Sequence, residues 1–259
     1  MRGWEKKLLG KTILNTRPLS QALPLAKAIE EEGGRCLVLP SVQIVPVVIP
    51  DKKLVKKQWE NTDIALFVSQ YAVQFFISLW NGTRMSGKIA AIGKATSEAL
   101  ESAGIPVDLT PEDPSSEDLL CLPELQSSSL KGKTVTIFRG KSGRTLLDET
   151  LKQRGALVKE IVLYERVLPV WTKADHELLM SDKIDLALGL SVDSLTYFFS
   201  QLDLLEKKRF LDVPWLIMSH RVAEEAKKLG IATVYTVSKG DVLGSLIRSC
   251  SPGTIDGVL

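Results

Sequence analysis

The sequence predicts an α/β protein built from two doubly wound parallel-sheet domains, and three observations lead to that class. First, the chain repeats itself: residues 63–69 (DIALFVS) recur as residues 185–191 (DLALGLS), 122 positions later (185 − 63 = 122). Second, short apolar runs alternate with helix-length amphipathic segments, which is typical of parallel α/β sheets. Third, glycines stand where helices need a left-handed residue after their last turn, at positions 33, 104, 155 and 230.

The individual elements follow from this alternation. In the first copy, β-branched and apolar runs predict strands at residues 12–15, 64–68 and 88–92, and periodic segments predict helices at 22–32, 72–79 and 96–103. The second copy predicts strands at 134–138, 185–190 and 215–218, and helices at 148–154, 194–202 and 223–229. The offset later becomes 126 (231 − 105 = 126), so the second copy carries four extra residues in a loop. Each copy has the alternation of a flavodoxin-like domain.

Two longer strand-like runs, residues 37–47 and 160–168, are counterparts in the repeat and are too long for one short strand. Each ends at a proline, so we expect a two-stranded connector between the domains at residues 39–45 and 164–169. The domains would then be residues 46–163 and a discontinuous set, residues 1–38 plus 170–259. Two consecutive domains that meet near residue 130 fit the repeat equally well. Either arrangement predicts a cleft between two similar domains, where we expect the ligand.

Composition argues against several classes of protein. With 33 basic and 31 acidic residues the net charge is +2, so a broad nucleic-acid-binding surface is not expected and anion recognition must be local. The polar N-terminus does not match a signal peptide, and the most apolar stretch, residues 37–49, is interrupted by Pro40 and Pro46. We therefore expect a cytoplasmic protein without a membrane span. Three cysteines without metal-type spacing and two separate histidines predict no metal site and no disulfide.

A basic segment follows the predicted strand at residues 134–138. The chain has five basic residues and no acidic one between residues 131 and 144. Backbone N–H groups and the dipole of the next helix favour a carboxylate there, whereas the spacing matches neither a phosphate loop nor a dinucleotide fingerprint. The candidates for anion binding are Arg139, Gly140, Lys141, Arg144 and, as the repeat partner of Arg139 (139 − 17 = 122), Arg17. Lys131 and Lys133 fit a solvated loop equally well.

Four hydroxyl side chains lie at predicted strand-to-helix junctions: Ser69, Thr96, Ser191 and Ser219. The simplest interpretation is helix capping, in which the hydroxyl accepts a hydrogen bond from the first helical turn. Capping and anion binding use the same free amides, so each junction is also a candidate for substrate contact.

An ordered set of motifs resembles the uroporphyrinogen-III synthase family. These are the segments NTRP (residues 15–18), FVS (67–69), AIGKAT (91–96), FRG (138–140) and VLY (162–164). The resemblance covers residues 11–247. It implies a two-lobed, monomeric, cofactor-free lyase of haem and tetrapyrrole synthesis, which cyclises hydroxymethylbilane to uroporphyrinogen III with loss of water and inversion of ring D through a spiro intermediate. A transient contact with hydroxymethylbilane synthase is a further expectation.

The resemblance also assigns residue roles. The eight carboxylates of that substrate agree with the anion-binding candidates. Tyr164 matches a family tyrosine thought to assist departure of the substrate hydroxyl, and a neutral phenol can donate a hydrogen bond at pH 7. A half-buried strand tyrosine is the structural alternative. The family usually carries a threonine slightly after position 219, whereas this chain has Ser219 followed by His220 and Arg221.

Two other classes of function stay open at this point. A non-catalytic two-lobed binding protein for a small organic anion has a similar architecture, although the missing export signal argues against it. A nucleotide-dependent transferase also uses doubly wound domains, but the phosphate-binding fingerprints are absent.

Overall fold

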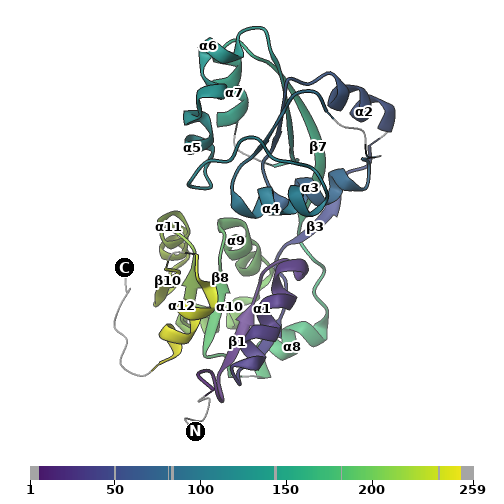
Figure 1. Cartoon of the computed structure of the whole chain (residues 1–259). Helices are drawn as coiled ribbons and strands as arrows, with labels where there is room; N and C mark the ends of the chain where they lie inside the picture. Colours follow the sequence, from purple (N-terminus) through teal and green to yellow (C-terminus); the bar gives the residue numbers. More distant parts are fainter. Residues whose placement is uncertain are drawn as a thin grey trace. The chain divides into compact units, whose positions relative to one another are not determined.

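The computed structural model describes residues 6–49, 51–80, 82, 85–142, 145–181, 183–238 and 240–251. The chain divides into two compact units (Figure 1). Unit 1 consists of Met1–Gln43 and Val167–Leu259, and unit 2 consists of Ile44–Arg166. The chain therefore passes from one unit to the other after Gln43 and again after Arg166.

Unit 1 is a parallel sheet with helices on both faces. The strand order is β10-β9-β8-β1-β2, with bounds β1 (Thr12–Asn15), β2 (Arg35–Val38), β8 (Leu186–Gly189), β9 (Trp215–Ile217) and β10 (Val234–Thr236). The helices are α1 (Leu19–Glu31), α8 (Lys173–Ser181), α9 (Val192–Gln201), α10 (Leu204–Asp212), α11 (His220–Leu229) and α12 (Val242–Cys250). Successive residues of β1 point to opposite faces: Ile13 packs with α1 and α12, and Leu14 packs in the aromatic cluster around Trp215.

Unit 2 has the same layered plan. Its strand order is β3-β7-β6-β4-β5, with bounds β3 (Gln43–Pro46), β4 (Ile64–Phe67), β5 (Lys88–Ala91), β6 (Thr134–Gly140) and β7 (Leu157–Val167). The helical segments are α2 (Lys52–Glu60), α3 (Gln70–Ile77), α4 (Lys94–Ser102), α5 (Ser116–Cys121), the short 3₁₀ helix η1 (Pro123–Leu125), α6 (Ser127–Leu130) and α7 (Leu146–Gln153). On one face, Phe67 stacks on Phe138 at a centroid distance of 4.6 Å. On the other, Leu66 and Ile137 pack against α5 and α7.

The internal repeat is preserved in the pairing register. Strand β1 pairs with β8 through Ile13 and Leu186, and β6 pairs with β4 through Val135 and Ile64. Both differences equal 122 (135 − 13 and 186 − 64). A carboxylate also recurs: Asp185 Oδ2 accepts the N–H of Thr12 at 2.9 Å, and Asp63 Oδ2 accepts that of Thr134 at 2.8 Å. Each sheet therefore combines a strand–helix–strand segment of one copy with the strand–helix–strand segment of the other.

The α/β class with parallel sheets is confirmed, and each strand and helix expected from the alternation is present with boundaries shifted by no more than three residues. The run at residues 37–47 is different. It is two strands, β2 and β3, which belong to different sheets. The run is interrupted because Pro40 has no N–H to donate, and the chain turns there. Ser41 secures the break, since its Oγ donates to Ser194 O at 2.7 Å.

Several elements were not anticipated. The segments α5, α6, α8, α10, α12 and β10 lie outside the repeat motifs, so the sequence comparison between copies gave no signal for them. Within the described part of the chain, none of the helices has the length and apolar character needed to cross a lipid bilayer.

Candidate active site

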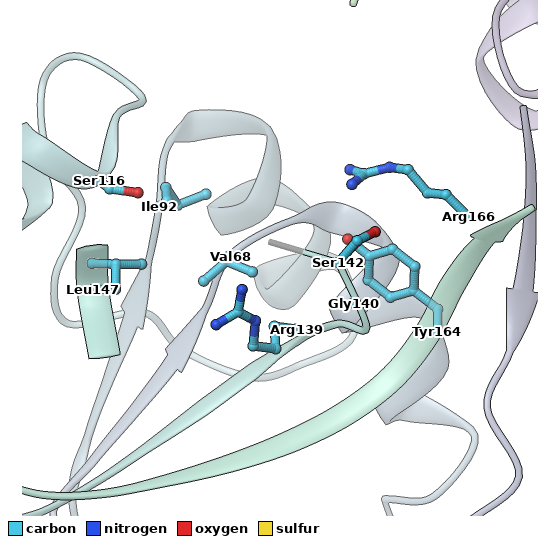
Figure 2. A pocket seen from close by; sticks show the side chains of 9 residues that line it. All are labelled: Val68, Ile92, Ser116, Arg139, Gly140, Ser142, Leu147, Tyr164 and Arg166. Carbon is cyan, nitrogen blue, oxygen red and sulfur yellow. The ribbon is translucent and has the colours of Figure 1, made fainter. Parts of the chain in front are cut away.

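A pocket in unit 2 lies at the carboxyl ends of the parallel strands, where α/β proteins commonly bind ligands. Its volume is about 160 Å³. Figure 2 shows the side chains that line it, with Arg139 coming from β6 and Tyr164 and Arg166 from β7. The complete lining set is Val68, Ile92, Ser116, Arg139, Gly140, Ser142, Leu147, Tyr164 and Arg166.

Tyr164 is held in the pocket by contacts to both its ring and its hydroxyl. Its residue surface is only 2% exposed. Helix α3 supplies Phe75, whose ring stacks on that of Tyr164 at 6.0 Å, and Tyr71, whose ring lies at 5.8 Å. The hydroxyl is 2.9 Å from Ser69 Oγ. A buried ring with a hydrogen-bonded hydroxyl presents one fixed orientation to a ligand.

Gly140 gives the Tyr164 ring its space. A Cβ at position 140 would lie 2.7 Å from Cε2 and Cζ of Tyr164, closer than real contacts allow. The pairing of β6 with β7 also shifts here: Arg139 pairs with Val162, but the next residue, Gly140, pairs with Tyr164. Such an irregularity re-aims side chains at the end of a strand. Glycine at this position therefore permits the strand β7 tyrosine to lie against the end of β6.

Strand β4 ends at Phe67, and Ser69 lies two residues later as the N-cap of α3. Its Oγ accepts the backbone N–H of Ala72 at 3.1 Å. The hydroxyl thus both caps the helix and contacts Tyr164. The capping interpretation is confirmed for Ser69, and the tyrosine contact is an addition that the sequence did not indicate.

The charged groups of the pocket are arginines. Arg139 is 8% exposed, and its Nη1 lies 3.5 Å from Glu160 Oε2. Arg166 places its Cζ 5.9 Å from the centroid of the Tyr164 ring, a cation–π geometry. Lys141 does not line the pocket; its exposed ammonium lies 2.8 Å from Glu165 Oε2, and this hydrogen bond raises the pKa of Lys141.

Two other expectations for unit 2 have different outcomes. Thr96 does not lie at the strand-to-helix junction, because Gly93 is the N-cap of α4 and Thr96 is buried within its first turn. The predicted position of Thr96 was wrong because the helix begins at Lys94, before the first apolar residues that indicated it in the sequence. Arg144 lies outside the described residues.

The three candidate residues of unit 1 each lie two residues after the end of a strand: Arg17 after β1, Ser191 after β8 and Ser219 after β9. Arg17 Nη2 donates to Gln21 Oε1 at 2.8 Å. Ser191 caps α9 in a capping box with Ser194. Ser219 is the exposed N-cap residue of α11, but within the described part of the chain its hydroxyl makes no capping hydrogen bond. The prediction that the Ser219 hydroxyl caps the helix was therefore wrong.

Sequence reasoning missed Arg166, Ser116 and Ser142. The signal for Arg166 was available: in a strand, residues two apart point to the same face, so Arg166 accompanies Tyr164. Ser116 comes from α5, for which no local pattern existed. Ser142 comes from the loop after β6, in the basic segment from which only charged residues and Gly140 were selected. Among the described residues, no three His, Cys, Asp or Glu side chains gather as metal ligands.

The fold and the pocket define an α/β protein with a pocket at the carboxyl ends of parallel strands, lined by a buried phenol and two guanidinium groups. Comparisons with known proteins identify the family. The family model described as uroporphyrinogen-III synthase HemD matches residues 24–247. The chain therefore belongs to the uroporphyrinogen-III synthase family. This family is one of enzymes of porphyrin biosynthesis, so a non-catalytic binding protein is not favoured.

Individual relatives agree with that family. Uroporphyrinogen-III synthase of Chlorobaculum parvum is 26% identical over 73% of this chain and 78% of its own length. The Escherichia coli uroporphyrinogen-III synthase is 28% identical over 89% of this chain and 96% of its own. The crystal structure of a mutant uroporphyrinogen III synthase from the extremely thermophilic bacterium Thermus thermophilus shares the fold, with a TM-score of 0.63, 18% identity and coverage of 92% and 96%.

Proposed function

We propose that this chain is a cyclising hydro-lyase that converts hydroxymethylbilane to uroporphyrinogen III, with loss of water and inversion of ring D. The observation that carries the proposal is the Tyr164 hydroxyl, fixed by Ser69 at 2.9 Å in a pocket that Arg139 and Arg166 also line. A phenol is a proton donor for a departing hydroxyl, and guanidinium groups recognise carboxylates. Family membership supports the same reaction.

The size of the pocket defines what it holds. At about 160 Å³ it is smaller than the roughly 300–1,000 Å³ of a site that buries a whole drug-sized ligand. It therefore receives one carboxylate arm or one pyrrole ring of the tetrapyrrole. Arg139 and Arg166 are assigned to a carboxylate there. The remaining carboxylates are assigned to basic and hydroxyl groups, namely Arg17, Lys141, Ser191, Ser219 and, from the sequence alone, Arg144. Thr96, which is 4% exposed in the first turn of α4, is a further hydroxyl candidate for a carboxylate.

The proposed chemistry needs two proton transfers at Tyr164, one from the phenol and one back to it. The C–O bond of the hydroxymethyl group breaks as the Tyr164 Oη–H proton moves to the departing oxygen, so water leaves and a phenolate remains. Ring D attacks the resulting azafulvenium cation through its substituted α-carbon and forms the spiro intermediate, and reopening and reclosure invert the ring. The proton lost from a ring carbon at closure restores the Tyr164 hydroxyl. Positioning of one folded substrate conformation supplies the rest of the rate.

The finer features belong to the same proposal. They are two flavodoxin-like domains joined by a two-stranded connector, a monomeric cytoplasmic enzyme without a cofactor, and a transient contact with hydroxymethylbilane synthase. The division of the chain into two compact units supports the first of them.

The test supplies hydroxymethylbilane, generated in situ by its own synthase, and separates the oxidised porphyrin isomers by chromatography. We expect predominantly the type III isomer, whereas the protein-free reaction gives type I. Tyr164→Phe should lower turnover by about 10 to 100-fold, at or below the lower end of general acid effects. A product mixture equal to the protein-free control would overturn the proposal.

A further inference from the structure

We infer that Ser69 is a positioning residue that acts through Tyr164 and does not itself bind the substrate. The inference rests on the proposed function and gives Ser69 a role in it. Ser69 Oγ has two partners: it accepts the N–H of Ala72 at 3.1 Å, and it lies 2.9 Å from Tyr164 Oη. Because the Ala72 contact uses an oxygen lone pair, the hydroxyl hydrogen of Ser69 can be donated to Tyr164.

Helix α3 holds the whole tyrosine side chain. Ser69 contacts the hydroxyl from the N-cap, and Tyr71 and Phe75 contact the ring from the first two turns. On another side, the ring lies against Gly140 at the end of β6, in the space that a Cβ at that position would occupy. The ring and its hydroxyl are thus fixed by one helix and one strand end. Loss of Ser69 would release the hydroxyl while the ring stays in place.

The second copy of the repeat shows what this arrangement requires. Ser191 corresponds to Ser69 (191 − 69 = 122) and also caps its helix, but its hydroxyl donates to Ser194 Oγ at 3.0 Å. The residue that corresponds to Ser194 is Ala72 (194 − 72 = 122), which has no oxygen to accept that bond. Val42 corresponds to Tyr164 (164 − 42 = 122). In unit 1, therefore, the capping hydroxyl of Ser191 donates to a neighbouring serine. In unit 2 the capping hydroxyl of Ser69 is next to the hydroxyl of Tyr164.

The proton step explains why the contact matters. When Tyr164 gives its proton to the departing hydroxyl, the phenolate needs a hydrogen-bond donor. Ser69 Oγ–H is within 2.9 Å of the phenol oxygen, and it stands at the amino end of α3, where negative charge is favoured. The Ser69 hydrogen bond is therefore stronger after the proton has moved than before it. An interaction of this kind raises kcat and leaves KM nearly unchanged.

The test compares Ser69→Ala in two backgrounds. In the wild-type background we expect kcat for type III isomer to fall by about 3 to 10-fold, with KM within about twofold, the effect of one lost hydrogen bond. In the Tyr164→Phe background the same change should alter kcat by less than about twofold, because its partner hydroxyl is already absent. Ser69→Thr, which retains the oxygen, should restore most of the rate.

Two further variants separate positioning from helix capping. Asp51→Ala removes the side-chain cap of α2 in the same unit and should lower thermal stability without changing kcat. Ala72→Ser retains the Ser69 cap but offers the Ser69 hydroxyl the acceptor that Ser194 provides in unit 1. We expect Ala72→Ser to lower kcat by about the same factor as Ser69→Ala, with little loss of stability. This variant answers the question even if Ser69→Ala does not fold.

Each outcome decides the matter. A raised KM with unchanged kcat in Ser69→Ala, or an equal loss in both backgrounds, would overturn the inference and indicate direct substrate contact or capping alone. Unchanged kcat in both Ser69→Ala and Ala72→Ser would also overturn it. If the wild-type protein itself yields only the type I isomer, the proposed function has failed, and the role of Ser69 fails with it.

Discussion

Replacement of Gly140 by alanine tests the tightest contact of the candidate active site. The added Cβ would lie 2.7 Å from the Tyr164 ring, whereas carbon atoms in ordinary contact are about 3.5 to 4.0 Å apart. The ring must therefore move by roughly 1 Å, or β6 and β7 must separate by a similar amount. Gly140 is not among the glycines with a positive φ, so steric contact rather than backbone strain sets the cost.

The magnitude has two parts. Overpacking a closed site costs about 1 to 3 kcal/mol of unfolding free energy. A displacement of about 1 Å also breaks the 2.9 Å contact between Tyr164 Oη and Ser69 Oγ, and misplacement by that distance can reduce a rate by about 100-fold. We expect Gly140→Ala to lower the melting temperature by several degrees, on the order of 2–4 °C per kcal/mol, and turnover by about 10 to 100-fold.

The assay measures thermal unfolding and the initial rate of type III isomer formation on the same preparations. Gly132→Ala is the matched control, because Gly132 has a φ of 76° and open space around it; it should lose stability through backbone strain and keep its turnover. Gly140→Ala in a Tyr164→Leu background should cost less stability than in the wild type, since the ring edge is gone. Full stability and full turnover of Gly140→Ala would refute the argument.

Three more predictions concern charge and reactivity. Arg166→Gln should raise KM by about tenfold with a smaller change in kcat, as expected for one lost carboxylate contact; an unchanged KM would remove Arg166 from the binding site. Burial alone would raise the pKa of Asp185, but the Thr12 N–H and the Lys183 and Lys11 ammonium groups together lower it. The charged carboxylate therefore stabilises the fold above about pH 4, and this contribution is lost as pH falls through the folded-state pKa. Asp185→Asn should destabilise the protein by about 2 kcal/mol at neutral pH and much less at pH 2.5. If the wild type and the variant differed in unfolding free energy by the same amount at both pH values, the charged Asp185 carboxylate would not be the stabilising group. Burial raises the pKa of the Cys36 and Cys250 thiols to about 11. Iodoacetamide at pH 8 should therefore alkylate the exposed Cys121 first. Early modification of Cys36, detected by peptide mass spectrometry, would count against its partly buried position.

Local signals in the sequence were sufficient for the elements of the repeat. The run at residues 12–15 is strand β1 with the same bounds, and the glycines at 33, 104, 155 and 230 all have positive φ. Such features depend on residue type and on the hydrophobic period over a few positions, so they can be predicted without knowledge of the tertiary contacts. The offset of 122 recurs in the pairing register of the two sheets.

The candidate site was predictable only in part. Residues at strand ends could be named, because carboxyl ends of parallel strands meet at one edge of a sheet. The strand period also indicates Arg166, two residues after Tyr164, but the direction of Lys141 could not be predicted. Lys141 bonds to Glu165 outside the pocket, because the shift in pairing between Arg139 and Gly140 changes the direction of the residues that follow Gly140.

By itself, then, the sequence determined the repeat, the alternation of strands and helices, and the family to which the chain belongs, since these are properties of order along the chain. The tertiary structure decided which side chains meet. Ser69 and Tyr164 are 95 residues apart, and their hydroxyls lie 2.9 Å from each other only because β4 and β7 both flank β6 in one sheet. Contacts of that separation depend on strand order and register, which no local pattern specifies.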